Sequence, residues 1–206
     1  HTTMTNLNLK SKFNTSNVTD MSSMFGSTAL TSLDLGDEFN TSNVTRMDSM
    51  FADCQKMSTI DLGDKFDTSR VISIRQMFGR CSELTSVNLG DKFDTSNVIM
   101  MDQMFFLSSK LTNIYLGDKF DTSNVKFMDN MFNQCKNLVS LDLGDKFVTS
   151  NVTDMSYMFQ SCTSLTSLDL GPAFTKIADT NTSMFNTTGK PGAIVIQAPE
   201  AIFENN

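Results

Sequence analysis

The sequence contains one histidine, His1, and no tryptophan among its 206 residues. A single imidazole excludes most histidine-based acid–base catalysis and most zinc sites. Lys and Arg are also few, at 16 against 23 Asp and Glu, so the net charge is −7. Nucleic-acid-binding surfaces carry the opposite balance, and we expect no nucleic-acid partner. No apolar run approaches the roughly 20 residues of a membrane helix, so we expect no membrane insertion by this segment.

Motifs of the common enzyme classes are missing as well. The chain has no glycine-rich phosphate loop, no nucleophile elbow and no Ser or Cys with a histidine partner. Its four cysteines form two separated pairs at one repeated position, which predicts buried free thiols rather than a metal cluster. We therefore expect a protein that is not an enzyme and that uses no cofactor and no metal.

What the sequence has in abundance is an internal repeat of 26 or 27 residues. An apolar pair with one residue between its members, a Met-Phe pair and a further Phe recur once in each copy. The Met of the Met-Phe pair stands at positions 24, 50, 77, 104, 131, 158 and 184. Such regularity indicates a solenoid, in which each coil buries its apolar side chains by stacking on its neighbours.

Each repeat divides into two halves with different apolar spacing. In the first half Leu33 and Leu35 alternate with polar neighbours, which predicts a short strand with one buried face. In the second half Val44, Met47 and Met50 stand three residues apart, which predicts a short helix or a 3₁₀ turn. We therefore expect an α/β repeat solenoid with one parallel β-sheet face and short helical or 3₁₀ segments on the other face.

The last repeat departs from this pattern and sets the expected domain boundary. Its spacing is short, and Pro191 and Pro199 follow it closely. We expect residues 1–190 to form a solenoid of about seven coils. Residues 191–206 are expected to form a final strand that caps the solenoid, or to begin the next module.

The repeat also resembles a known family. Its common string, Phe-Asp-Thr-Ser-Asn-Val-x-x-Met-x-x-Met-Phe-x-x-Cys-x-x-Leu-x-x-Leu-x-Leu, is best kept over residues 93–98 and 152–170. This string is similar to the BspA-like leucine-rich repeats of bacterial surface proteins. The resemblance implies a leucine-rich-repeat-like right-handed coil in an extracellular protein of the bacterial cell surface, with its anchor outside this segment. It further implies adhesion to a host or extracellular-matrix protein.

Equivalent residues of a solenoid form rows along its axis, so candidate sites are sought in rows. On the sheet face the outward strand position carries Asp61, Asn88, Tyr115 and Asp142 in four successive repeats. Tyr115 is the one aromatic residue of that row and has Asn113 beside it, a composition typical of a contact site. The alternative is a solvated face in which Tyr115 fills space between strands. A flat row does not supply the converging oxygens that calcium needs.

A second candidate is an apolar patch in the central repeats. Ile72, Ile99, Met100 and Phe127 stand where other repeats carry Thr, Asp or Arg, and Phe106 also breaks the polar pattern. If these side chains face solvent, they form a patch of the kind that marks an interface. If they face inward, the central coils close a different local core. Two functions follow: an adhesin segment that binds a host or matrix protein, or a non-binding structural spacer of a larger surface protein.

Overall fold

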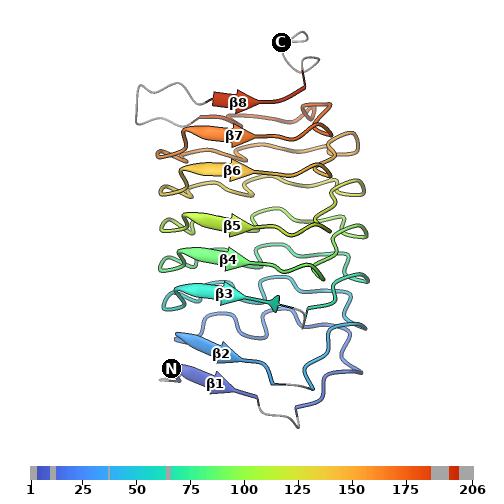
Figure 1. Cartoon of the computed structure of the whole chain (residues 1–206), viewed down its shortest axis with the longest axis vertical. Coiled ribbons are helices and arrows are strands. Elements are labelled where there is room, and N and C mark those ends of the chain that lie inside the picture. The colour runs from blue at the N-terminus through green and yellow to red at the C-terminus, as the bar shows by residue number, and fades with distance from the viewer. Residues whose placement is uncertain (1–3, 10–12, 37, 64–65, 187–194, 200–206) are drawn as a thin grey trace.

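The alternating apolar pairs of the repeat form three-residue strands, and successive strands lie in parallel along one side of the molecule (Figure 1). The computed structural model describes residues 4–9, 13–36, 38–63, 66–186 and 195–199. Within these residues the chain is a parallel β-solenoid of about seven turns. The strands are β1 (Asn6–Asn8), β2 (Ser32–Asp34), β3 (Thr59–Asp61), β4 (Ser86–Asn88), β5 (Asn113–Tyr115), β6 (Ser140–Asp142), β7 (Ser167–Asp169) and β8 (Val195–Gln197).

Strand register follows the repeat. Ile60 pairs with Val87, and Val87 in turn pairs with Ile114, so equivalent apolar residues lie above one another. Paired strands form three sections, β1-β2, β3-β4-β5 and β6-β7-β8. Among the described residues no ladder joins β2 to β3 or β5 to β6. The parallel sheet is therefore confirmed, but it is interrupted twice.

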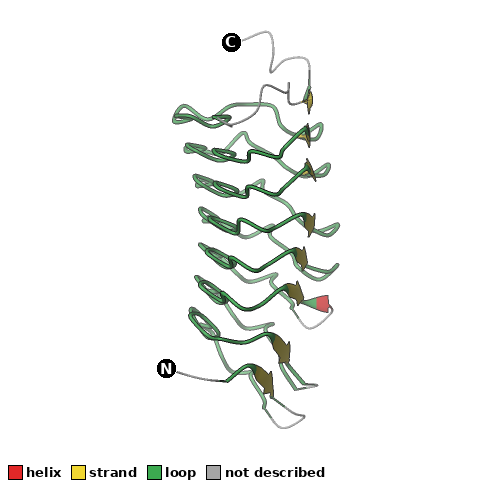
Figure 2. Cartoon of the chain, turned by 90° about the vertical axis from the view of Figure 1, so that its left-hand side faces the viewer, coloured by secondary structure: helices red, strands yellow, loops and turns green. Residues whose placement is uncertain are grey.

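The prediction of helical or 3₁₀ segments in the second half of each repeat is wrong. The described residues contain no α-helix, and 3₁₀ geometry occurs at Gly63 alone (Figure 2). In the coil that follows β2, Ser49 and Asp53 have φ values of 57° and 59°. Such left-handed residues cannot continue a right-handed helix. The segment instead forms consecutive turns.

Hydrogen bonding between coils explains why these turns are stable. Ser49 N donates to Arg75 O at 2.7 Å, and Phe51 N donates to Met77 O at 2.9 Å. In a helix the same amides would bond four residues back within their own segment. Here alternate amides bond to the next coil, so stacking satisfies the backbone on this side as the sheet does on the other. A repeat read alone does not show where its amides bond.

The apolar spacing nevertheless identifies the buried side chains correctly. The Phe residues of the Met-Phe pairs form a continuous stack, in which the ring centroids of Phe51 and Phe78 lie 5.6 Å apart and those of Phe78 and Phe105 lie 5.5 Å apart. Val44, Met47 and Met50 are fully buried beside that stack. One core therefore runs through all the coils.

The predicted terminal segment, residues 191–206, includes β8. Ile196 of β8 pairs with Leu168 of β7. Residues 187–194 and 200–206 lie outside the described residues, and the choice between a cap and the start of a next module stays a prediction. No helix among the described residues is long and apolar enough to cross a membrane.

Candidate binding surfaces

On the sheet face, the predicted row of polar residues has a local structural role. Asp61 Oδ1 accepts a hydrogen bond of 3.1 Å from Gly63 N, and Asp142 Oδ1 accepts one of 2.8 Å from Gly144 N. Each side chain thus caps the turn that follows its own strand. Asn88 Nδ2 also donates to Asp61 Oδ1 at 3.1 Å, which links neighbouring coils. The turn therefore accounts for Asp and Asn in this row without a ligand.

Tyr115 stands in the same row and behaves differently. Its side chain is half exposed, at 50%. Its hydroxyl donates to Asp91 Oδ1 at 3.1 Å, and this bond to a carboxylate raises the pKa of Tyr115. Asn113 Nδ2 donates to Thr112 Oγ1 at 3.1 Å. The hydrogen bond from Tyr115 to Asp91 joins the ring to the turn of the preceding coil.

Four of the five predicted sheet-face residues are brought together, and Asp61 does not line the same recess. Asn88, Asn113, Tyr115 and Asp142 all line a shallow recess of about 430 Å³. A larger hollow of about 540 Å³ opens beside it, where β5 and β6 are not paired. Tyr115 and Asp142 line this hollow too, together with Asp118. The sheet face therefore offers an aromatic ring surrounded by carboxylates.

The second candidate surface is larger and lies on another side of the coil. Ile72 and Ile99 line a groove with a volume of about 1060 Å³. Their exposed fractions are 42% and 37%, and that of Phe127 is 41%. Met100 and Phe106 are half-buried. The side chains of Ile72, Ile99 and Phe127 thus face solvent rather than closing a local core.

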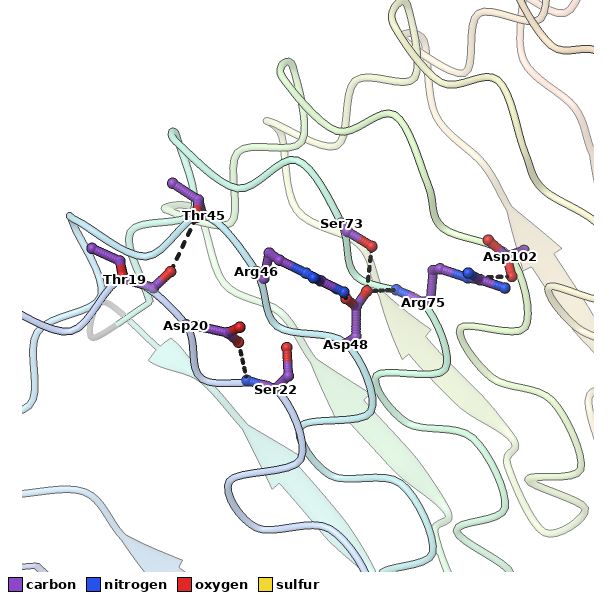
Figure 3. Close-up of polar contacts among 9 residues, drawn as sticks. All are labelled: Thr19, Asp20, Ser22, Thr45, Arg46, Asp48, Ser73, Arg75 and Asp102. Carbon is purple, nitrogen blue, oxygen red and sulfur yellow. Dashed lines mark hydrogen bonds and ion pairs between the residues drawn. The ribbon is translucent and has the colours of Figure 1, made fainter.

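Two rows of equivalent residues form this groove. One row begins with Thr19 and Thr45, which Figure 3 shows in adjacent coils, and continues through Ile72 and Ile99. The other is an asparagine row. The complete lining is Asn17, Thr19, Asn43, Thr45, Ser69, Arg70, Ile72, Asn97, Ile99, Asn124 and Lys126.

The threonine row shows what the repeat ordinarily requires at the Ile positions. Thr45 Oγ1 donates to Thr19 O at 3.1 Å (Figure 3), and Thr153 Oγ1 donates to the carbonyl of the preceding coil at 3.0 Å. Ile72 N still donates to Thr45 O at 2.9 Å, but an Ile side chain has no hydroxyl to add a second bond. Ile99 has lost the same bond. The exposed Ile residues therefore replace a residue that the fold itself uses.

The asparagine row also forms hydrogen bonds between coils, and one of its residues is replaced in the groove. Asn43 Nδ2 donates to Ser16 O at 2.7 Å, and Asn97 Nδ2 donates to Ser69 O at 2.8 Å. Each Asn side chain thereby binds its coil to the backbone of the preceding one. At the equivalent position Arg70 instead donates from Nη1 to Asn43 Oδ1 at 2.7 Å. The groove and the role of Arg70 were missed by the sequence analysis, although Ser-Arg-Val in place of Ser-Asn-Val was a visible signal.

Next to the groove lies a network of charged residues (Figure 3). Asp48 forms an ion pair with Arg46, whose Nη2 lies 2.6 Å from Asp48 Oδ2, and it accepts a hydrogen bond from the Ser73 hydroxyl. Arg75 Nε lies 2.8 Å from Asp102 Oδ2. Asp102 is only 4% exposed, and burial is the largest cause that raises its pKa. The contacts Ser73–Asp48 and Arg75–Asp102 join successive coils, whereas Arg46–Asp48 lies within one coil, so the network is a structural feature.

Phe106 has a partner within the fold. The guanidinium carbon of Arg80 lies 6.0 Å from the centroid of its ring, at the limit of a cation–π contact. Phe127 and Met100 pair through their backbones in a parallel bridge between coils, and Ser73 pairs with Met100 in the same way. Of the predicted apolar patch, the structure thus places Ile72 and Ile99 in the lining of the groove, whereas Met100, Phe106 and Phe127 are not part of that lining.

These features define a repeat protein of the parallel β-solenoid class, with candidate binding surfaces formed by rows of equivalent residues. The chain belongs to the family described as Mycoplasma protein of unknown function, DUF285, whose model matches residues 1–113 and 83–193. Searches of curated proteins and of solved structures give no significant match to the chain.

Proposed function

We propose that this chain is a non-enzymatic binding segment of an extracellular bacterial cell-surface protein of the BspA-like leucine-rich-repeat type. It adheres to a host or extracellular-matrix protein through its repeat surface. One observation carries the proposal: Ile72 and Ile99 lie exposed in adjacent coils of one groove, at a position where other coils carry Thr. Full burial of an Ile side chain contributes about 1.5–3 kcal/mol. A partner that covers both side chains therefore gains the free energy of burying the apolar surface that the fold leaves exposed.

The rigidity of the solenoid supports the same proposal. Backbone hydrogen bonds join successive coils on the turn side and, with two interruptions, on the sheet side. Stacked Phe rings join them through the middle, as at Phe132 and Phe159, whose centroids lie 5.5 Å apart. A surface held in this way needs little ordering when it binds. The resemblance to bacterial surface repeats supplies the extracellular location and the class of partner.

A structural spacer is the second candidate, and the continuous core favours it. A spacer needs only stiffness, so departures from the repeat should be scattered along its length. In this chain Arg70, Ile72, Ile99 and Lys126 depart from the repeat within one groove of the central coils. This clustering favours the binding segment over the spacer.

The test is a solid-phase binding assay against a panel of extracellular-matrix proteins. The variant Ile72→Thr/Ile99→Thr restores the residue that the repeat uses elsewhere and is expected to fold. Tyr115→Asp, which restores the common residue of the sheet-face row, is the matched control. Saturable binding that is lost in the first variant and kept in the control supports the proposal. Loss in the control alone would move the site to the sheet face, and no binding by the unaltered chain would favour the spacer.

A further inference from the structure

The groove has a charge opposite to that of the chain that contains it. Among the described residues that line it, Arg70 and Lys126 are cationic and none is a carboxylate. The chain as a whole carries a net charge of −7. Complementary charge favours the correct partner and speeds its association. The groove is therefore suited to an anionic ligand, whereas the charged residues that line the hollow beside Tyr115 are four carboxylates and one cation, Lys146.

Both cations depart from the rows in which they stand. Arg70 replaces an Asn whose amide would bond to the preceding coil, and Lys126 replaces a Thr whose hydroxyl would do the same. A guanidinium has five N–H donors, and the single bond from Arg70 Nη1 to Asn43 leaves others to bind a carboxylate. At positions 70 and 126 the side-chain hydrogen bond to the preceding backbone is thus replaced by a positive charge, and both charges lie in the same groove.

The length of the groove fits an extended peptide. It runs along the solenoid from the coil of Asn17 to the coil of Lys126, which are four steps apart. At about 4.8 Å per coil these steps span roughly 19 Å, the length of about six residues of extended chain. Arg70 and Lys126 lie two coils apart, or roughly 10 Å, which corresponds to about three residues of such a chain.

Other lining groups suit a peptide as well. Asn97 Nδ2 and Asn124 Nδ2 donate to Ser69 O and Ser96 O at 2.8 and 2.7 Å. Within the described chain this leaves the Oδ1 atom of each Asn available to accept an N–H from a peptide backbone. Ile72 stands in the coil of Arg70, and Ile99 stands in the coil between those of Arg70 and Lys126, so both can contact aliphatic side chains of the ligand.

We propose that the groove binds an extended acidic peptide segment of the partner, with two carboxylates about three residues apart and aliphatic side chains beside them. Arg70 and Lys126 bind the carboxylates, Ile72 and Ile99 contact the aliphatic side chains, and the Asn row accepts backbone N–H groups. This inference rests on the proposed binding function and specifies the chemistry of its ligand.

The test uses a fluorescein-labelled peptide amide, Ser-Glu-Val-Pro-Glu-Val-Ser, titrated with the unaltered chain and followed by fluorescence anisotropy. Two further peptides carry Gln or Lys in place of both Glu residues. We expect the Glu peptide to bind at least about tenfold more tightly than the Gln peptide, and its affinity to fall as salt is added. Equal affinities for the three peptides would overturn the proposal.

Two double variants locate the site. Arg70→Asn/Lys126→Thr takes both residues from the repeat's own pattern, so the fold is expected to persist, with a urea midpoint no lower than that of the unaltered chain. We expect this variant to lose at least about tenfold in affinity for the Glu peptide. Lys92→Ala/Lys119→Ala removes two positive charges outside the groove and is expected to change the affinity less than about twofold. Similar losses in both variants would mean non-specific attraction and would overturn the assignment.

Two more outcomes separate this inference from the proposed function. Matrix-protein binding that is lost in Ile72→Thr/Ile99→Thr but kept in Arg70→Asn/Lys126→Thr would leave a binding segment standing and overturn the acidic ligand. Charge-dependent peptide binding without any matrix-protein binding would support the groove and contradict the adhesin. If a sulfated oligosaccharide bound the groove more tightly than the Glu peptide, the ligand would be an anionic glycan, and the peptide proposal would be overturned.

Discussion

Asn43 and Arg70 occupy the same position of successive coils, yet only Asn43 bonds to the backbone of the coil before it. Asn43 Nδ2 donates to Ser16 O, whereas Arg70 Nη1 donates to Asn43 Oδ1. Among the described residues no side-chain amide donates to the carbonyl of Ser42, the atom that an Asn at position 70 would reach. At position 70 the Asn hydrogen bond between coils is therefore replaced by the positive charge of Arg70 in the groove.

The first prediction follows from this pair. Arg70→Asn should raise the free energy of unfolding by about 0.5–1.5 kcal/mol, because it restores a part-buried hydrogen bond to the backbone of the preceding coil and loses only the solvent-exposed bond from Arg70 to Asn43. Urea denaturation followed by circular dichroism measures the change. The control is Arg70→Ala, which removes the cation without supplying the amide and should give no such gain. A loss of stability in Arg70→Asn would contradict the structural role assigned to the row.

A second prediction compares two glycines at the equivalent turn position of successive coils. A Cβ added at Gly171 would lie 2.1 Å from Gly144 O, whereas a Cβ at Gly144 meets nothing within 4 Å. Both have left-handed φ values, 73° and 77°. Gly144→Ala should therefore cost only the backbone strain, about 1–2 kcal/mol, and Gly171→Ala should cost clearly more because coils must separate.

Thermal and urea unfolding of the two Ala variants tests this difference. Gly117→Ala provides a second crowded case, since its Cβ would lie 2.4 Å from Gly90 O. Equal destabilisation of all three variants would mean that β5 and β6 are as closely stacked as the other strands. That result would contradict the interruption of the sheet between β5 and β6, beside Tyr115.

Much of this architecture could be predicted from the sequence, and the errors have a physical cause. The positions of Leu33, Val44 and Met47 in the repeat identify the strand and the inward side chains correctly, because the spacing of apolar residues shows which side chains face the core. The helical prediction failed since spacing three apart is shared by a helix and by turns with left-handed residues such as Ser49. Only the hydrogen bonds between coils separate the two.

The candidate site could be predicted in part for a related reason. Ile72 and Ile99 were visible as departures from a polar row. Arg70 was overlooked, because its significance depends on the bond that Asn makes at that position in other coils. Lys126 likewise gains meaning only when the groove places it on the same surface as Arg70. A single repeat does not reveal which rows share a groove.

The third prediction concerns the buried thiols. Burial raises the pKa of Cys81 and of Cys162 to about 12, and the Sγ atom of each donates to a backbone carbonyl at 3.1 Å. At pH 8 only about one thiol in ten thousand would then be ionised, and the thiolate is the reactive form. Cys54 and Cys135 are buried free thiols too.

A thiol reagent such as dithionitrobenzoate provides the measurement. The folded chain should react very slowly at pH 8, and all four cysteines should react quickly in denaturant. Mass spectrometry without reductant should show no disulfide. Rapid labelling of the folded chain would contradict the burial of this row.

The last prediction uses the ion pair between Arg75 and Asp102. Burial raises the pKa of Asp102 in the folded state, and Arg75 opposes that rise. A group with a raised folded-state pKa stabilises the fold below its unfolded value of 3.8, and that contribution is lost as the pH rises through the folded-state pKa. Arg75→Ala removes the opposing charge, so the loss on raising the pH should become larger.

Denaturation at several pH values between about 4 and 7 measures this effect. The variant should differ little from the unaltered chain at the acidic end, and should be less stable by about 1–3 kcal/mol at the neutral end, where the buried carboxylate is ionised without its partner. Arg75→Lys keeps the charge and should reduce the difference. The double variant Arg75→Ala/Asp102→Asn should remove the contribution of this pair to the pH dependence of stability, because no carboxylate is then left in the pair. A constant difference across the range would show that Arg75 contributes through packing rather than through its charge.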